Sequence, residues 1–242
     1  MKTRAVWMSL GVLLLTLTNV ATIAADPTDT PAPVDDKAIL QLLAEGRDAM
    51  QAGRRLEAIT DKFDPVIRSF EQQRASSDKL FFCARSPMEM ILYSGLGAAA
   101  KHDTVVLDVL WSDAYLLKGY ALVELGEVAK AREALQAAVA LAPQNAQYLA
   151  ELAYNFQAAH EFEKSIEIYD QAIDAAEWSP TELQKEERGR ALRGKGYSLI
   201  ELGRLDEAET IYKQALKVNR SDKKARDELT YIKGLRKKAG AR

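Results

Sequence analysis

Apolar residues recur every three to four positions along most of this chain from residue 37 onward, which is the spacing of amphipathic helices. In the first such stretch, Lys37–Gln51, the apolar positions are Ile39, Leu40, Leu42, Leu43, Ala49 and Met50. A second helical pattern follows Gly53. Asp64 and Pro65 then have the residue types preferred at an N-cap and at the first position of a helix. The pattern predicts a helical hairpin over residues 36–73, broken or kinked near Pro65.

Two short apolar runs interrupt the helical pattern, at Leu80–Ala84 and at Thr104–Trp111. Neither is long enough to separate a strand from a buried helical or extended segment, and if both are extended they can pair with each other. Between them, residues 86–89 read Ser-Pro-Met-Glu, which is a capping box with proline at the first helical position. We therefore expect a helix that begins there and runs to about Ala100.

The sequence then repeats itself. Lys118–Gly126 (KGYALVELG) closely resembles Lys195–Gly203 (KGYSLIELG), and a weaker copy lies at Leu152–Phe156. Aligned on these segments, three stretches of 34 residues share one pattern: 112–145, 146–179 and 189–222. Residues 180–188 form a nine-residue insertion between the second and third stretches. A plain helical bundle has no reason to keep such a period, so we expect repeated helical pairs.

The period and the residue types resemble the tetratricopeptide repeat (TPR). The matching positions in the three copies are Tyr115, Gly119, Leu122, Ala131, Leu135, Ala138 and Pro143; Leu149, Ala153, Phe156, Ser165, Tyr169 and Ala172; and Leu192, Gly196, Leu199, Ala208, Tyr212 and Ala215. The resemblance covers about half of the chain after residue 25. It implies an all-α solenoid in which helical hairpins stack and small residues allow the helices of each pair to approach.

Both flanks of the repeats are expected to be helical. Gly46, Gly53 and Ala58 fit a degenerate first copy that starts at Ile39, although Pro65 departs from it. The N-terminal helical region is thus 37–111, whether or not it contains a true repeat. Residues 223–242 predict a capping helix and basic tail, with Ala225, Leu229, Ile232 and Leu235 on one face.

The resemblance also implies that the first helix of each repeat lines a concave groove. From these helices we select eight candidate ligand-binding residues: Tyr120, Glu124, Tyr154, Gln157, Arg190, Arg193, Tyr197 and Glu201. A tyrosine stands at the ninth position of every copy, and its apolar ring and polar tip suit peptide contact. The alternative is that these tyrosines pack within the repeats. The clamp of chaperone-binding TPR domains has asparagine at this position, so we reject that specialisation.

The two candidate arginines of the third copy would suit a carboxylate ligand. The alternative is that Arg190 and Arg193 form a solvated helix end near Glu186 and Glu187.

Composition limits the other functions. The net charge of −2 argues against nucleic acid as a partner, and one cysteine and two histidines leave little for a metal site, so we expect neither metal nor cofactor. Cys83 and His102 are the only candidates for a thiol nucleophile and its base. Because Cys83 lies within an apolar run, we expect a buried, inert thiol, and we expect no enzyme. A lone cysteine bridging two chains remains an alternative.

The N-terminus has the pattern of a secretory signal peptide over residues 1–25, with cleavage after Ala24 or Ala25. Lys2 and Arg4 precede an uncharged apolar run that is short for a bilayer span of about 20 residues. An uncleaved anchor is the alternative. Residues 26–36 are rich in Pro, Thr and Asp and predict a flexible linker.

These patterns predict a periplasmic or secreted TPR scaffold that binds a protein or peptide partner, with no stable membrane insertion after signal cleavage. Neither the identity of the partner nor the oligomeric state follows from the sequence. The alternatives are an envelope-assembly subunit that uses its convex faces and an enzyme with a pocket in residues 80–111.

Overall fold

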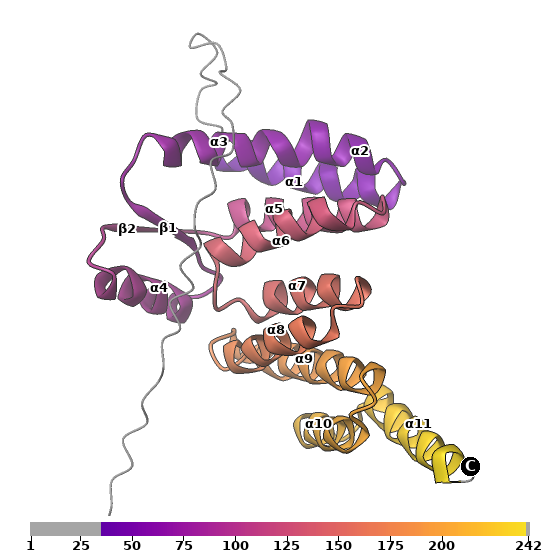
Figure 1. Cartoon of the computed structure of the whole chain (residues 1–242). Coiled ribbons are helices and arrows are strands. Elements are labelled where there is room, and N and C mark those ends of the chain that lie inside the picture. The colour runs from indigo at the N-terminus through magenta and orange to yellow at the C-terminus, as the bar shows by residue number, and fades with distance from the viewer. Residues whose placement is uncertain (1–34, 241–242) are drawn as a thin grey trace, which may run out of the picture. The chain divides into compact units, whose positions relative to one another are not determined.

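The computed structural model describes residues 35–240, so the predicted signal peptide and most of the predicted linker lie outside the described residues. The elements, in chain order, are α1 (Asp36–Gln51), α2 (Arg55–Glu57), the π-helical segment η1 (Ala58–Phe63), α3 (Asp64–Ala75), β1 (Leu80–Cys83), α4 (Pro87–Ala99), β2 (Thr104–Leu107), α5 (Leu110–Glu124), α6 (Val128–Leu141), α7 (Ala146–Ala158), α8 (Phe162–Ala175), α9 (Thr181–Glu201), α10 (Leu205–Val218) and α11 (Lys223–Gly240) (Figure 1). The expected all-α class is confirmed, with one two-stranded ribbon inserted into it.

The predicted repeats are three helical hairpins, α5/α6, α7/α8 and α9/α10, and α11 packs on α10 and α9. In the first and third hairpins, a glycine of the first helix lies against a large side chain of the second. A Cβ added at Gly119 would lie 3.0 Å from Leu135, and one added at Gly196 would lie 2.7 Å from the ring of Tyr212. Small residues at this position therefore set the distance between the paired helices, as the repeat pattern implies.

Each first helix of the repeats ends in the same backbone turn. Gly126 and Gly203 have φ values of 76° and 72°, and the middle copy places His160 there with φ 60°. The amide of His160 donates to the carbonyl of Gln157 (3.0 Å), and that of Glu161 donates to the carbonyl of Phe156 (2.9 Å). Such paired bonds end a helix at a residue in the left-handed conformation. Glycine adopts this conformation without strain, and histidine does not. The middle repeat thus keeps the turn at a cost in backbone strain.

The first hairpin, α1 with α2, η1 and α3, has the geometry of a repeat with one residue added. A Cβ at Gly46 would overlap the ring of Phe63, the same pairing as Gly119 with Leu135, but the separation along the chain is 17 residues instead of 16. The π-helical turn takes up the extra residue, and the amide of Asp64 donates to the carbonyl of Ile59, five residues back. The repeat pattern is therefore shifted by one position after η1.

The prediction of an N-cap at Asp64 was wrong. The backbone is helical on both sides of Asp64, and its carboxylate accepts a hydrogen bond from Lys118 Nζ on α5 (2.7 Å) instead of capping a helix. Pro65 has no amide hydrogen and crowds the preceding turn, which the wider π-helical turn accommodates. Asp64 and Pro65 therefore mark a π-helical bulge inside a helix and not the start of one.

The segment between the first two hairpins is a small βαβ insert. Strands β1 and β2 pair in parallel, with Leu80 opposite Thr104 and Cys83 opposite Leu107. Of the possibilities that the sequence left open for the two apolar runs, the structure thus shows extended segments that pair with each other. The second strand ends at Leu107, and Trp111, which we had included in the extended run, belongs to α5. Its ring stacks on Phe70 with centroids 5.5 Å apart, because this position faces the first hairpin.

The capping box at the start of α4 is present in altered form. Ser86 Oγ accepts from the amide of Glu89 (3.2 Å), but the Glu89 carboxylate accepts from the amide of Arg85 (2.7 Å), one residue before the N-cap. Glu89 is fully buried, although it stands on a helix that is otherwise apolar. This placement joins α4 to the chain just before it.

The nine-residue insertion does not form a loop. Thr181 begins α9, so the inserted residues are the first two turns of a 21-residue helix. This N-terminal extension carries Glu187, which is buried against the insert. The third hairpin still packs directly on the second, because α9 contacts both α7 and α8.

Within residues 35–240, none of the helices has the length and apolar character needed to cross a bilayer.

Candidate functional site

A groove of about 850 Å³ lies over α7 and α9, bordered by the start of α8 and by α11. Its lining includes five of the eight predicted site residues: Tyr154, Gln157, Arg190, Arg193 and Tyr197. The lining also contains residues that we did not select: Ala158, His160, Phe162, Tyr169, Glu186, Gly194, Tyr212, Lys224 and Glu228. The remaining three predicted residues, Tyr120, Glu124 and Glu201, are not part of it.

The three tyrosines of the repeat pattern have two different environments. Tyr154 and Tyr197 are 51% and 43% exposed and face the groove from neighbouring first helices. Tyr120 is half-buried, and its hydroxyl donates to Glu151 Oε1 (2.8 Å). Burial, together with the negative charge of Glu151, raises the pKa of Tyr120 above its ordinary value. Tyr120 is thus packed within the repeats, whereas Tyr154 and Tyr197 are exposed at an open surface.

Glu151, which the sequence analysis did not select, joins three successive first helices. Its carboxylate accepts from Tyr120 on α5 and from the guanidinium of Arg190 on α9, while Glu151 itself stands on α7. It is buried, so the two donors compensate most of what it loses by leaving water. Burial lowers the pKa of the Arg190 guanidinium, but the negative charge of Glu151 outweighs this effect and holds that pKa above its ordinary value.

The arginine pair is bound by carboxylates of other helices and is not a solvated helix end next to Glu186 and Glu187. Arg193 Nη1 donates to Asp222 Oδ2 (2.5 Å), just before α11. About half of the Arg190 side chain stays exposed at the groove, whereas Arg193 is more covered. Arg190 therefore retains guanidinium donors for a ligand after its bond to Glu151 is made.

Gln157 joins α7 to α9. Its amide nitrogen donates to the carbonyl of Gly194 (3.0 Å) and to Ser198 Oγ (2.8 Å), and it is buried. Ser198 Oγ in turn lies 3.1 Å from Ser165 Oγ, so a short chain of polar groups runs through the contact of the second and third hairpins. Gln157 therefore fixes the groove wall, and the two donors of its amide group are already used.

Close packing at Gly194 shapes the groove floor. A Cβ added there would overlap the ring of Tyr169, which is buried beneath the groove. No pattern in the repeat distinguishes this glycine, because it stands between the signature positions. Only the stacking of α8 on α9 reveals why a larger residue does not fit.

Charges of both signs surround the exposed aromatic rings. Lys224 and Glu228 come from α11, and Glu186 comes from the N-terminal extension of α9. Burial raises the pKa of Glu228, and the nearby Asp227 adds to that effect. Two other predicted residues lie apart: Glu124 accepts from Arg55 Nε on α2 (2.5 Å), and Glu201 is exposed near the end of α9.

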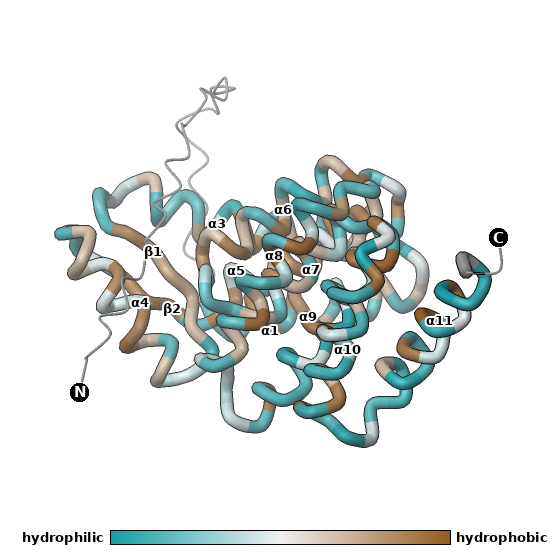
Figure 2. The backbone as a smooth tube through the Cα atoms, turned by 60° about the horizontal axis from the view of Figure 1, so that its bottom comes forward, coloured by the Kyte–Doolittle hydropathy of each residue, from teal (hydrophilic) through white to brown (hydrophobic). Residues whose placement is uncertain are grey.

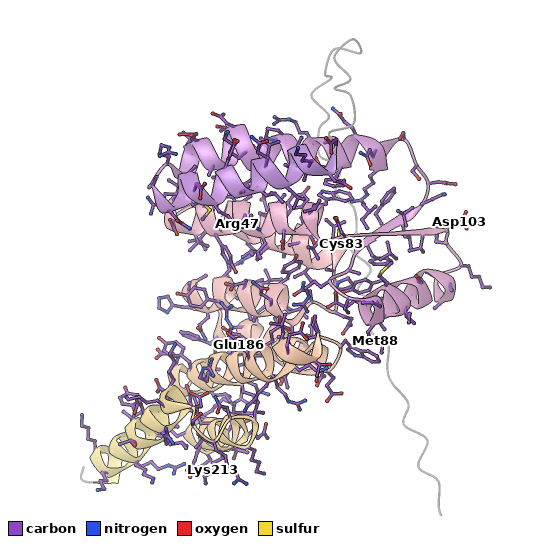
Figure 3. All side chains as sticks on the ribbon, turned by 180° about the vertical axis from the view of Figure 1, so that it is seen from behind. Arg47, Cys83, Met88, Asp103, Glu186 and Lys213 are labelled. Carbon is purple, nitrogen blue, oxygen red and sulfur yellow. The ribbon has the colours of Figure 1, made fainter. Side chains whose placement is uncertain are left out.

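The structure does not bring Cys83 and His102 together. Cys83 lies opposite Leu107 at one end of the parallel ribbon, and His102 comes two residues before Thr104, which pairs with Leu80 at the other end. Figure 3 labels Cys83 and, next to His102 in the chain, Asp103. Cys83 is fully buried, and this burial raises the pKa of its thiol to about 11. The thiol is therefore protonated and inaccessible near neutral pH. In the described part of the chain, no three His, Cys, Asp or Glu side chains are placed to hold a metal ion.

Comparisons with known proteins support the repeat assignment. Two family models, both described as tetratricopeptide repeat, match residues 112–145 and 150–225, so the chain contains tetratricopeptide repeats over these two stretches. A search of curated proteins returned no match.

Solved structures with a similar fold include PilF of Pseudomonas aeruginosa, at 16% identity and a TM-score of 0.55, over 84% of this chain and 71% of that one. MamA is similar at 22% identity and a TM-score of 0.49, over 77% of this chain and 81% of that one. The first TPR domain of Spaghetti (RPAP3), solved with an HSP90 peptide, is similar at 17% identity and a TM-score of 0.45, over 51% of this chain and 91% of that one. At these identities the likeness to PilF shows a shared fold.

Proposed function

We propose that this protein is an exported binding scaffold that receives a peptide segment of a protein partner in the groove over α7 and α9. The observation that carries the proposal is the pair Tyr154 and Tyr197. Both rings come from the same position of adjacent repeats, both line one groove, and both are about half exposed. Exposed aromatic rings in a concave site are typical of surfaces that bury apolar side chains of a ligand.

The surroundings of these rings suit an extended peptide. The ring edges offer apolar contact, and the hydroxyls and the free donors of Arg190 offer hydrogen bonds to peptide carbonyls. Lys224 and Glu228 stand on the opposite border and supply charges of either sign. The walls are held by bonds that a ligand need not break, namely those of Gln157 and Glu151. A groove that is already fixed loses little conformational entropy on binding.

Export rests on the sequence pattern of residues 1–25. N-terminal sequencing of the protein recovered from cells tests it: a mature chain beginning at Ala25 or Asp26 supports export with cleavage. A chain that retains Lys2 and Arg4 and fractionates with membranes would instead support the uncleaved anchor.

The alternative of an enzyme with a pocket in residues 80–111 loses its only thiol candidate, because Cys83 is buried and protonated. If the protein is instead a structural subunit, its partner binds the convex faces and makes no contact with the groove. The experiment that separates it from our proposal is a peptide-display selection on the mature chain, followed by fluorescence anisotropy with the enriched peptides.

The decisive variant replaces Tyr154 and Tyr197 with alanine. We expect at least a tenfold loss of peptide affinity, because truncation of one hot-spot residue typically costs about 2 kcal/mol or more and tenfold in affinity is about 1.4 kcal/mol. Tyr231→Ala is the matched control, since Tyr231 is 55% exposed on α11 and does not line the groove. Equal affinities of the double variant and the control would disprove groove binding.

A further inference from the structure

Helix α4 has an uncharged outer surface that nothing in the described chain covers. We use the name α4 face for its exposed residues Met88, Met90, Ile91, Ser94, Gly95, Ala98 and Ala99. Ile91 is 69% exposed, and a Cβ added at Gly95 would meet nothing within 4 Å. From Pro87 to Ala100 the only charged residue is Glu89, which is buried on the opposite side. Figure 2 shows hydrophobic colour along much of this helix.

The α4 face does not have the composition of a solvent-facing helix. Surface helices keep a polar side toward water, and helices that are apolar all round are normally buried. Helix α4 buries Tyr93 and Gly97 against the rest of the insert, which leaves its second apolar side in water. This face lies outside the repeats and outside the groove, so the peptide-binding proposal does not explain it.

A buried ion cluster holds α4 in a fixed position. Arg85, directly before the helix, donates to Glu89 (3.0 Å) and to Glu187 on the N-terminal extension of α9 (2.6 Å). Ser179 donates to the same Glu187 (2.5 Å). All of these groups are almost completely covered. The cluster therefore presents the α4 face as a rigid surface, which lowers the entropy cost of docking.

Side-chain size divides the α4 face into two halves. The N-terminal half carries the large residues Met88, Met90 and Ile91, and the C-terminal half carries the small residues Ser94, Gly95, Ala98 and Ala99. In an antiparallel pair of α4 helices, Ile91 of one copy lies over Gly95 of the other, and Met88 lies over Ala98. The two-fold axis then passes near the level of Tyr93. The face is complementary to itself in this one orientation, which is what a two-fold interface requires.

Charges at the ends of the face favour the same orientation. Antiparallel helices place the positive end of one helix dipole beside the negative end of the other. Glu182, which shares a hollow of about 640 Å³ with Met88 and Trp178, comes to the end where the other copy carries Lys101. Asp103 follows two residues later and partly offsets that lysine. The face itself brings no charge that would have to be desolvated.

We propose that a second copy of this chain covers the α4 face, through antiparallel packing of the two α4 helices. A 13-residue helix is about 20 Å long, so the contact is smaller than a standard interface of roughly 800 Å² per partner. The dimer is accordingly weak and forms with rising protein concentration. Our proposal places its dissociation constant at roughly 10–100 μM, between the micromolar and millimolar levels.

Cysteine cross-linking tests the orientation directly. Ser94 lies near the proposed axis, and the only native cysteine, Cys83, is fully buried and gives a low background. We expect Ser94→Cys to form a disulfide-linked dimer under mild oxidation at about 100 μM protein, the upper end of the proposed range of dissociation constants. Thr230→Cys is the matched control, since both hydroxyls are exposed and donate to the carbonyl four residues earlier in their helices. Equal cross-linking of the two variants would overturn the proposal.

Sedimentation velocity provides the second test, without a cross-linker. The wild-type chain should sediment increasingly as a dimer as concentration rises, and Ile91→Glu should remain monomeric at every concentration. Leu56→Glu, at an exposed leucine outside the α4 face, should behave as wild type. A wild-type monomer throughout that range would contradict a second copy as the occupant.

Lipid is the competing occupant, and flotation with phosphatidylcholine vesicles separates it from the dimer. If the wild-type chain floats with these vesicles and Ile91→Glu does not, while neither dimerises, the occupant is a lipid surface and the proposal is wrong. Tyr154→Ala with Tyr197→Ala should leave dimerisation unchanged, so this test is independent of the groove.

Discussion

The groove over α7 and α9 and the α4 face are both exposed and hydrophobic, but they are built differently. The groove sets aromatic rings among charges of both signs, and its walls are tied by buried polar bonds. The α4 face has no exposed charge, and its two halves differ mainly in side-chain size. The difference teaches that the repeats provide a site suited to an extended polar chain, whereas the insert provides a site suited to another apolar helix.

Both surfaces depend on the same N-terminal extension of α9. Glu186 of that extension borders the groove, and Glu187 anchors α4 through Arg85. The nine residues that interrupt the repeat period thus connect the two surfaces. The predictions below separate them, beginning with the largest expected effect.

Removal of Arg85 should be the most damaging single change. Arg85→Met leaves Glu89 and Glu187 buried without their shared cation, and breaking a buried pair in this way costs roughly 3–5 kcal/mol. We expect that loss in the free energy of unfolding measured by urea denaturation. Arg188→Met is the control, because its pair with Glu177 is exposed and should contribute less than about 1 kcal/mol. Similar losses for both variants would refute the idea that the cluster anchors α4.

Gly194→Ala should damage the groove specifically. The added methyl overlaps the ring of Tyr169, and overpacking of this kind typically costs about 1–3 kcal/mol. Displacement of Tyr169 should also weaken peptide binding while the α4 dimer persists. Gly189→Ala, in the same helix, has room for the methyl and should be neutral or slightly stabilising. A neutral Gly194→Ala would show that the groove floor is loosely packed.

His160→Gly should have the smallest effect, in the opposite direction. The left-handed turn of the middle repeat is strained with histidine, and relief of that strain exceeds the entropy cost of glycine by roughly 0.5–1 kcal/mol. Thermal unfolding should therefore shift upward by a few degrees. A downward shift would mean that the contact of His160 with Phe162 outweighs the backbone strain.

The sequence was most informative where structure repeats. Gly119 and Ala153 are 34 residues apart, and Ala153 and Gly196 are separated by the same period plus the nine-residue insertion. This spacing was sufficient to predict helical hairpins, and Gly119 and Gly196 do lie against large side chains of the paired helix. The resemblance to the tetratricopeptide repeat implied that Tyr154 and Tyr197 face a groove, and both line the groove over α7 and α9. Pairing of the two apolar runs was one possibility that their length left open, and the structure shows that both runs are extended and paired.

Periodicity does not determine which residues meet between hairpins. Tyr120 stands at the same repeat position as Tyr154, yet only Tyr120 meets a carboxylate, Glu151, from the next hairpin. The anchoring of Arg85 by Glu187 joins residues 102 positions apart, and no local pattern marks it. Asp64 was misread because an aspartate before proline looks the same at a helix start and inside a π-helical turn.

The central claim is tested most directly by comparing the peptide affinities of two separate variants. With a peptide selected on the mature chain, Tyr154→Ala combined with Tyr197→Ala should lower affinity at least tenfold, about 1.4 kcal/mol or more. Ile91→Glu, which removes the α4 contact, should bind the same peptide with wild-type affinity. Loss of affinity in Ile91→Glu, or its retention in the double tyrosine variant, would contradict the account of two independent surfaces.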